Sequence, residues 1–159
     1  MSINTDAVQR LYIAYFNRPA DPAGLTYFES LLPATTVATQ AQLEVIADTE
    51  FSPSPEYIDL YSGQTNTQII NNLYLNLFGR AAEPAALVGA DSWVQALDTG
   101  TETFASIALQ LTYSAQGTDA TAIANKVTAA TDFTDAVDTT AEIVGYSGNA
   151  AAASSRAWL

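Results

Sequence analysis

The chemistry open to this chain is limited first by the side chains that it lacks. Its 159 residues include no histidine and no cysteine, so schemes in which histidine activates a serine or cysteine nucleophile are excluded. Paired carboxylates remain, because two acids suffice for glycoside hydrolysis. The candidates are Glu29, Glu44, Asp48 and Glu50, but their helical positions favour solvated faces. No glycine-rich phosphate loop is present, and we expect a protein that is not an enzyme.

A second set of acids has the spacing of metal ligands. Asp132, Asp135 and Asp138 recur at i, i+3 and i+6. Calcium takes six to eight oxygen ligands, usually from a loop that bends at a glycine. The run contains no glycine, so a solvated acidic face is the stronger interpretation. We expect no required cofactor, with calcium as an optional ligand of these three aspartates.

Aromatic and amide side chains supply the remaining candidate chemistry. Polysaccharide-binding grooves combine flat rings with amides and acids that pair with sugar hydroxyls. Five residues predicted at loop edges could line such a groove: Tyr57, Tyr61, Asn66, Tyr113 and Gln116. The alternative for each ring is the hydrophobic core, where most aromatic side chains of a small helical domain lie. Five further rings are assigned to the core: Tyr12, Phe16, Tyr74, Phe78 and Trp93.

The charge balance narrows the range of partners. The sequence has 17 acids against 5 bases, a net charge of −12, which argues against nucleic acid and anionic membrane surfaces as partners. It contains neither a basic segment followed by a short apolar run nor an apolar run of spanning length. We therefore predict no cleavable signal peptide and no membrane insertion.

The elements that must position these residues come from an internal repeat. The stretch 11–25 recurs as 73–87, a period of 62 residues, and the copies realign after a slip of three residues. Repeats of this length indicate stacked supersecondary units. We predict two related helical units, 1–64 and 65–118, followed by a C-terminal helical extension, 119–159.

Each copy has the pattern of a helix, a corner and a second helix. The predicted buried faces follow i, i+3, i+4 and i+7 spacing: Val8, Leu11, Tyr12 and Tyr15 in the first copy, and Ile70, Leu73, Tyr74 and Leu77 in the second. Asn17 and Gly79 occupy the position of a left-handed helix end. Further helices are expected over 39–51, 55–61, 103–113, 120–137, 139–144 and 150–159. The prediction is an all-α bundle of six to eight helices.

Each corner carries an arginine followed three residues later by an acid. Arg18 precedes Asp21, and Arg80 precedes Glu83. Each acid stands before a proline, in the order expected of a helix N-cap and first helical residue. We favour a structural role, in which each arginine bonds a carbonyl at its corner and the nearby acid; the alternative is an anion or sugar ligand.

These motifs resemble the helical family called domain of unknown function 4214. The matching segments are Leu11-Tyr12, Asn17-Arg18, 21–28 (DPAGLTYF) and 54–57 (SPEY), and the resemblance covers roughly 5–137. It implies an all-α fold but no agreed activity. It also implies a place at the N-terminal end of long bacterial proteins exported by type I secretion, including surface-layer and calcium-binding repeat proteins.

The resemblance therefore implies an extracellular, non-catalytic anchoring domain at the bacterial cell surface. The implied partner is lipopolysaccharide or another cell-surface polysaccharide, with neighbouring copies in a lattice as a further possibility. The alternatives are an accessory or catalytic domain of a polysaccharide-acting enzyme and a protein–protein assembly module. We also expect a longer chain, because the last helix reaches Trp158 and Leu159 without a terminating signal.

Overall fold

The computed structural model describes residues 2–146 and 148–156, and these residues form helices and no strands. The helices are α1 (Thr5–Phe16), α2 (Pro22–Ser30), α3 (Gln40–Ile46), the π-helix η1 (Ala47–Phe51), α4 (Pro55–Tyr61), α5 (Asn66–Phe78), α6 (Pro84–Leu87), α7 (Trp93–Thr99), α8 (Phe104–Ser114), α9 (Gly117–Ala136), α10 (Thr140–Gly145) and α11 (Gly148–Arg156). The all-α prediction is confirmed. The predicted number of six to eight helices was too low: the described residues form eleven α-helices and one π-helix, in part because two of the expected helices are each divided in two.

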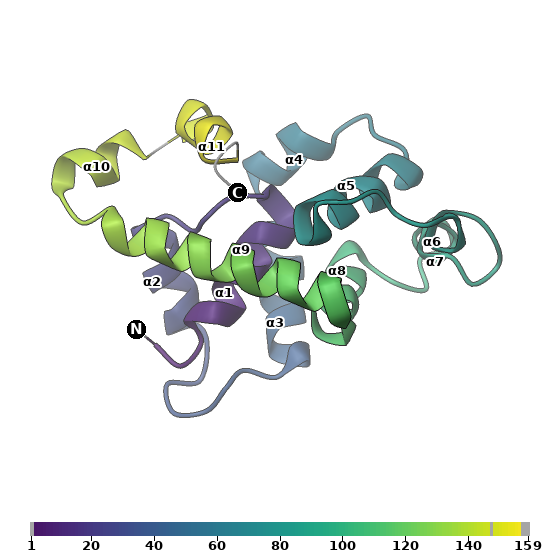
Figure 1. Cartoon of the computed structure of the whole chain (residues 1–159), viewed down its shortest axis with the longest axis horizontal. Coiled ribbons are helices and arrows are strands. Elements are labelled where there is room, and N and C mark those ends of the chain that lie inside the picture. Colours follow the sequence, from purple (N-terminus) through teal and green to yellow (C-terminus); the bar gives the residue numbers. More distant parts are fainter. Residues whose placement is uncertain (1, 147, 157–159) are drawn as a thin grey trace.

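Helices α1 and α5 are the central pair, and α9 crosses both of them (Figure 1). The side chains on the two predicted faces are all buried. Both helices end as predicted, since Asn17 and Gly79 adopt left-handed φ values of 49° and 69°. Asn76 of α5 donates a hydrogen bond to the carbonyl of Ala14 at 2.9 Å. These two positions are 62 residues apart, so equivalent parts of the two units meet.

The helix expected over 39–51 changes to a π-helix at Ala47. The amide of Ser52 donates to the carbonyl of Ala47 at 2.9 Å, across five residues. The widened turn places Phe51 inside an aromatic cluster, where its ring stacks on Phe16 with centroids 5.4 Å apart. Periodicity at 3.6 residues does not reveal such a single wide turn.

Side-chain amides hold the two corners in the same way, a buried one in the first unit and a partly buried one in the second. The Gln9 side-chain oxygen accepts from the Ala20 amide at 2.9 Å. In the second unit, the Asn71 oxygen accepts from the Ala82 amide at 3.1 Å. The repeat thus extends to polar contacts that the hydrophobic pattern does not show. Gln9 also donates to Thr134 at 2.9 Å and ties α1 to α9.

The C-terminal extension follows the predicted order of helices. The expected helix over 120–137 is α9, that over 139–144 is α10, and that over 150–159 corresponds to α11. Ser147, Trp158 and Leu159 lie outside the described residues. The expectation that the last helix reaches Leu159 without a terminating signal therefore falls on residues that are not described. Within the described part of the chain, no helix is both long enough and apolar enough to span a membrane.

The packing of α2 on α1 depends on the absence of a side chain at Gly24. A Cβ atom there would overlap the hydroxyl of Tyr12 and approach the Asp21 carboxylate at 2.9 Å. Asp21 is the N-cap of α2, and its Oδ1 accepts from the Gly24 amide at 2.7 Å. In the second unit the corresponding residue is Ala86, so the requirement for glycine belongs to the first unit alone.

We predict that Gly24→Ala lowers the free energy of unfolding by about 1–3 kcal/mol, the range for overpacked sites. Gly145→Ala is the matched control, because no atom lies within 4 Å of its added Cβ and its helix should gain about 0.5–1 kcal/mol. Chemical denaturation followed by circular dichroism measures both. Equal stability of Gly24→Ala and the native chain would contradict this packing.

Burial of four phenols predicts a loss of stability in alkali. Burial raises the pKa of Tyr57 to about 12 and also raises the pKa of Tyr12, Tyr15 and Tyr61. Below the ordinary pKa of 10.0, these phenols are neutral in both states and their contribution is fully present. As the pH rises further, tyrosines of the unfolded chain ionise first, so unfolding is favoured.

We therefore expect a constant free energy of unfolding from about pH 7 to about pH 9 and a steep decrease above about pH 10. Tyrosinate absorbance should rise together with the loss of helix rather than before it. Tyrosinate absorbance that rises fully while the helices persist would contradict the buried assignment.

Candidate functional site

An open pocket of about 790 Å³ lies where the second unit departs from the first. The single helix α2 follows the first corner, whereas the longer second copy forms α6, a loop and then α7. Trp93 begins α7, at the position that aligns with Phe28. Phe28 packs on Phe51 with ring centroids 4.6 Å apart. Trp93 is only half-buried and lines the pocket.

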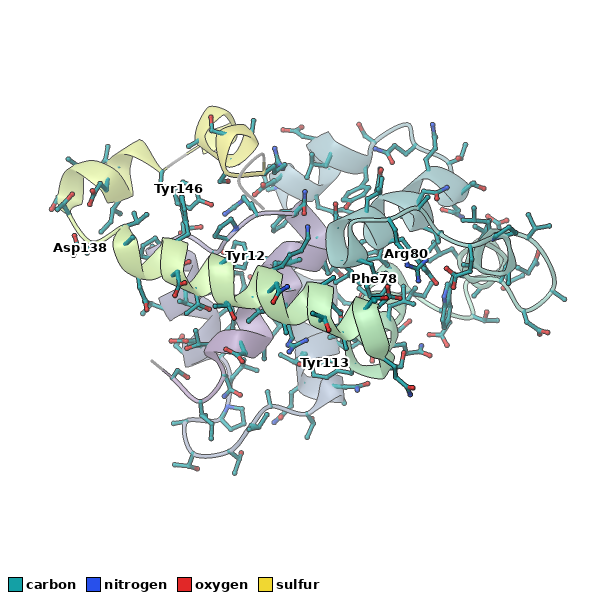
Figure 2. The ribbon with its side chains drawn as sticks, in the orientation of Figure 1. Tyr12, Phe78, Arg80, Tyr113, Asp138 and Tyr146 are labelled. Carbon is teal, nitrogen blue, oxygen red and sulfur yellow. The ribbon has the colours of Figure 1, made fainter. Side chains whose placement is uncertain are left out.

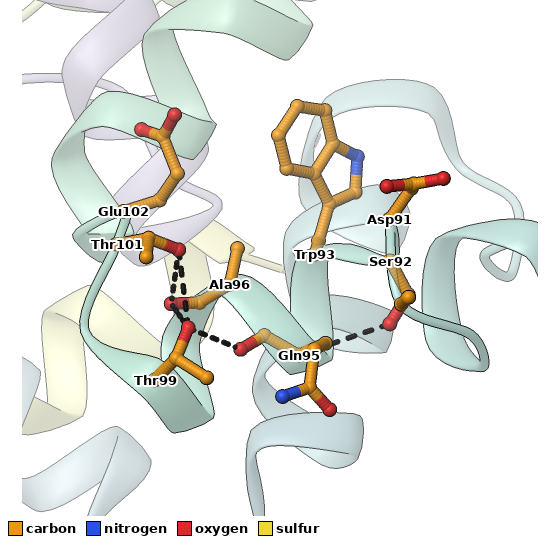
Figure 3. A pocket seen from close by; sticks show the side chains of 9 residues that line it. Asp91, Ser92, Trp93, Gln95, Ala96, Thr99, Thr101 and Glu102 are labelled. Atoms are coloured by element: carbon orange, nitrogen blue, oxygen red, sulfur yellow. Dashed lines mark hydrogen bonds between the residues drawn. The ribbon is translucent and has the colours of Figure 1, made fainter.

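The indole ring packs partly against the hydrophobic core, and acidic and polar side chains line the pocket beside it. Figure 3 shows the ring between the side chains of Asp91 and Glu102, with Gln95 and Thr99 on the other side of α7. The complete lining is Ala90, Asp91, Ser92, Trp93, Gln95, Ala96, Thr99, Thr101 and Glu102. We call this set the Trp93 pocket.

Both ends of α7 are fixed by local hydrogen bonds. At its start, Ser92 is the buried N-cap: its hydroxyl accepts from the Gln95 amide at 3.2 Å and donates to the Gly89 carbonyl at 2.9 Å. At its end, the Ala96 carbonyl accepts from the amides of Thr101 at 3.0 Å and Glu102 at 3.3 Å. Trp93 and Glu102 therefore stand on two anchored turns, which gives the pocket a defined shape.

The two carboxylates keep acceptor capacity toward the pocket. Glu102 Oε2 accepts from the hydroxyl of Ser106 at 2.5 Å and from the amide of Gln110 at 3.0 Å. Both bonds end on the same oxygen, so Oε1 remains to accept from a ligand. Asp91 is exposed. A flat apolar ring beside hydrogen-bond acceptors suits a ligand that has both C–H faces and hydroxyl groups.

A smaller cavity of about 210 Å³ lies between the two units. It is lined by Tyr61, Gln64, Asn72, Asn76 and Arg156, among others. Its amides already bond to the protein, since Asn72 donates to Gln64 at 2.7 Å and Asn76 donates to a carbonyl of α1. These amides hold the units together, which makes this cavity a weaker ligand site than the Trp93 pocket.

The five predicted polysaccharide ligands have different partners and do not line one groove. The rings of Tyr57 and Tyr61 contact each other with centroids 4.6 Å apart, and Tyr61 donates to the Tyr15 carbonyl at 2.9 Å. Tyr61 is buried because it lies on the inner face of α4 rather than at a loop edge. Asn66 donates to Asp98 at 2.6 Å.

The other two predicted ligands lie around the junction of α8 and α9. Tyr113 is exposed on the last turn of α8, and its ring lies 5.7 Å from the guanidinium carbon of Arg10. Gln116 is the exposed N-cap of α9. Neither residue lines the Trp93 pocket. Trp93, which was assigned to the core, is partly buried against it, and the rest of its surface lines the pocket. The helical pattern does not show that the slip of three residues opens this part of the second unit.

The predicted calcium ligands are not brought together. Asp132 and Asp135 lie exposed on the last turns of α9, and Asp138 is exposed beyond its end. Within the described ranges, no group of three or more acidic, histidine or cysteine side chains is placed to hold a metal ion. The physical reason for their separation is that α9 has no bend at this point, so its carboxylates cannot surround one ion.

The first arginine corner has a partner that the sequence analysis missed. Arg18 donates to both oxygens of Glu56, at 2.9 Å and 2.7 Å, and to the Pro19 carbonyl at 2.9 Å. Asp21, the expected partner, is farther away at 3.7 Å. Burial alone would lower the pKa of Arg18, but the hydrogen bonds and charge of Glu56 raise it. Arg156 also donates to Glu56, at 2.6 Å.

The second corner repeats this arrangement nearer the surface. Arg80 donates to both oxygens of Asp119, at 3.0 Å and 2.6 Å, and to Glu83 at 2.8 Å. The hydrogen bonds from Arg80 lower the pKa of both acids. The Arg80 side chain is 43% exposed, against 11% for Arg18. In both units, therefore, the main acid comes from the first turn of a later helix, α4 or α9.

Part of the chain matches a known family. Residues 48–118 match the family described as "Domain of unknown function (DUF4214)". This DUF4214 match begins in η1 and includes α4 to α8, so it contains Glu56, Arg80 and the whole Trp93 pocket. It is shorter than the range 5–137 over which the resemblance was expected. No curated protein and no solved structure matches the chain.

We predict that removing the acid of the first corner costs far more stability than removing its counterpart. Glu56→Gln removes the acid paired with Arg156 and leaves Arg18 in a mostly buried place with only the more distant Asp21, and should cost about 3–5 kcal/mol. Asp119→Asn breaks a largely exposed pair and should cost about 1 kcal/mol or less. Urea denaturation of both variants measures the difference. Equal losses would show that the two corners are energetically alike.

Proposed function

We propose that this chain is a non-catalytic anchoring module that recognises cell-surface polysaccharide through the Trp93 pocket. The module would attach a secreted bacterial protein, of the surface-layer type, to lipopolysaccharide on the outside of the cell. The observation that carries the proposal is the half-buried indole ring between Asp91 and Glu102 in an open pocket.

The chemistry of the pocket supports a sugar ligand. The indole face is amphipathic and can cover the C–H face of a pyranose ring. The oxygens of Asp91 and Glu102 can pair with its hydroxyl groups. The pocket is wide and open rather than deep, which suits an internal segment of a long chain better than a small enclosed substrate.

Charge is the main obstacle to binding an anionic polysaccharide. The net charge of −12 and the two acids of the pocket repel phosphate or carboxylate groups. Millimolar calcium would screen this repulsion and could bridge a protein carboxylate to an anionic sugar. Because the described residues offer no cluster of three metal-binding side chains, the glycan itself would have to supply part of the calcium coordination.

The same two carboxylates favour a second candidate function, that of a polysaccharide-acting enzyme or its accessory domain. Asp91 and Glu102 line the same pocket, and a glycosidase likewise works with two acids at one site. An enzyme would release reducing ends, whereas an anchoring module would only bind. The two functions are therefore separated by one assay on the same protein.

The test is co-sedimentation of the chain with lipopolysaccharide from cells that have or lack O-polysaccharide, with calcium or with a chelator. We expect binding that requires the O-polysaccharide and is weakened by the chelator, without release of reducing sugar. Trp93→Ala should weaken binding about tenfold or more, as loss of a central aromatic anchor does. Asp91→Asn probes the same pocket at an exposed position.

Tyr27→Ala is the matched control, because Tyr27 is an exposed ring next to Phe28 in the equivalent part of the first unit. Thermal unfolding checks that every variant is folded. Equal binding to both kinds of lipopolysaccharide would overturn polysaccharide recognition and leave a protein-assembly role. Steady release of reducing ends would favour the enzyme.

A further inference from the structure

The two arginine corners differ in what covers them. We define the first corner as Phe16, Arg18, Pro19 and Glu56, and the second corner as Phe78, Arg80, Ala81 and Asp119. We call residues 139–156, which contain α10 and α11, the C-terminal arm. The arm lies over the first corner. In Figure 2, Tyr146 of the arm is far from Arg80 and Phe78, so the arm does not reach the second corner of its own chain.

The arm satisfies the acceptors of the first corner with two side chains. The hydroxyl of Tyr146 donates to the Pro19 carbonyl at 2.9 Å, and its ring lies 5.9 Å from the Arg18 guanidinium carbon. Arg156 donates to the Phe16 carbonyl at 2.9 Å and to Glu56 at 2.6 Å. Phe16 ends α1, so Arg156 also completes the C-terminus of that helix.

The second corner presents the same acceptors in the same order. The Ala81 carbonyl corresponds to that of Pro19, and Phe78, which ends α5, corresponds to Phe16. Asp119 holds Arg80 with two hydrogen bonds, as Glu56 holds Arg18. The Arg80 guanidinium carbon lies 5.4 Å from the centre of the Phe78 ring. No side chain among the described residues donates to the Phe78 carbonyl.

We propose that the second corner is a docking site for the C-terminal arm of a second copy of this chain. Among the described residues, the arm is the segment that fits such a corner, through the phenol of Tyr146 and the guanidinium of Arg156. Docking would bring Arg156 of one copy toward Asp119 and Glu83 of the other. This local attraction opposes the repulsion between two acidic proteins.

The arm is suited to such an exchange. Helix α10 has no buried residue, and α9 ends at Ala136, so residues 137–139 provide a short hinge before the arm. The arm would give up its hydrogen bonds to the first corner of its own chain and form the equivalent bonds at the second corner of another copy. Because the arm would move from a first corner to a second corner, the contact is heterologous. Such a contact closes into a ring of two or more copies, or extends from copy to copy.

The first experiment adds a synthetic peptide of residues 138–156 to the full chain and follows binding by NMR. We expect chemical-shift changes at residues 78–83 and 119, and a loss of affinity of about tenfold in Asp119→Asn. Asp135→Asn is the matched control, because it removes an exposed charge from the same helix away from the corner. Peptides with Tyr146→Phe or Arg156→Ala should bind more weakly than the native peptide.

The second experiment asks whether copies of the chain bind one another. Sedimentation velocity should show association that grows with concentration and is reduced in Asp119→Asn. The chain has no native cysteine, so Ala81→Cys and Gly145→Cys variants can be mixed, and a disulfide-linked heterodimer should form under mild oxidation. Trp93→Ala should change neither result, which separates this proposal from polysaccharide binding.

Two results would overturn the proposal. One is peptide binding that Asp119→Asn leaves unchanged, or no binding at millimolar peptide. The other is a chain that stays monomeric at every concentration and forms no heterodimer although the peptide binds. The second result would assign the corner to a segment of another protein.

Discussion

The pairing of a buried arginine with an acid from a later helix is the constraint on which this fold depends. Arg18 stands just after the end of α1, and Glu56 is held in the first turn of α4, beyond α2, α3 and η1. A guanidinium that is mostly removed from water requires a full set of acceptors. Its position therefore fixes where α4 begins and where Arg156 brings α11 back onto α1.

The same constraint explains how two copies of one repeat can differ in the exposure of their corners. Both units keep the arginine, the bidentate acid, the rings beneath the guanidinium and the side-chain amide that receives the corner backbone. Only the first corner lies under the C-terminal arm. The duplicated geometry is thus structural in one unit, while in the other it leaves a charged group largely in solvent.

The Trp93 pocket arises from a small departure from the repeat. Three residues more in the second copy prevent one continuous helix, so α6 ends after a single turn and α7 begins at a new cap. The indole of Trp93, like Phe28 at the equivalent position, packs partly against the core, and its remaining surface lines the pocket with two acids. In a chain without histidine or cysteine, this arrangement favours recognition over chemistry, which is why we place binding first among the proposed functions.

Local sequence determined the helices, their caps and their buried faces, because these depend on residues within one or two turns of each other. The left-handed ends at Asn17 and Gly79 and the core positions of Ile70 and Leu73 are of this kind. Tertiary structure alone decided that Glu56 rather than Asp21 is the main partner of Arg18, and that Tyr61 is buried. It also decided that Trp93 opens to a pocket and that the three aspartates near the end of α9 stay apart. Periodicity shows which face of a helix is apolar, but the packing of distant helices determines which polar groups meet and which rings remain accessible.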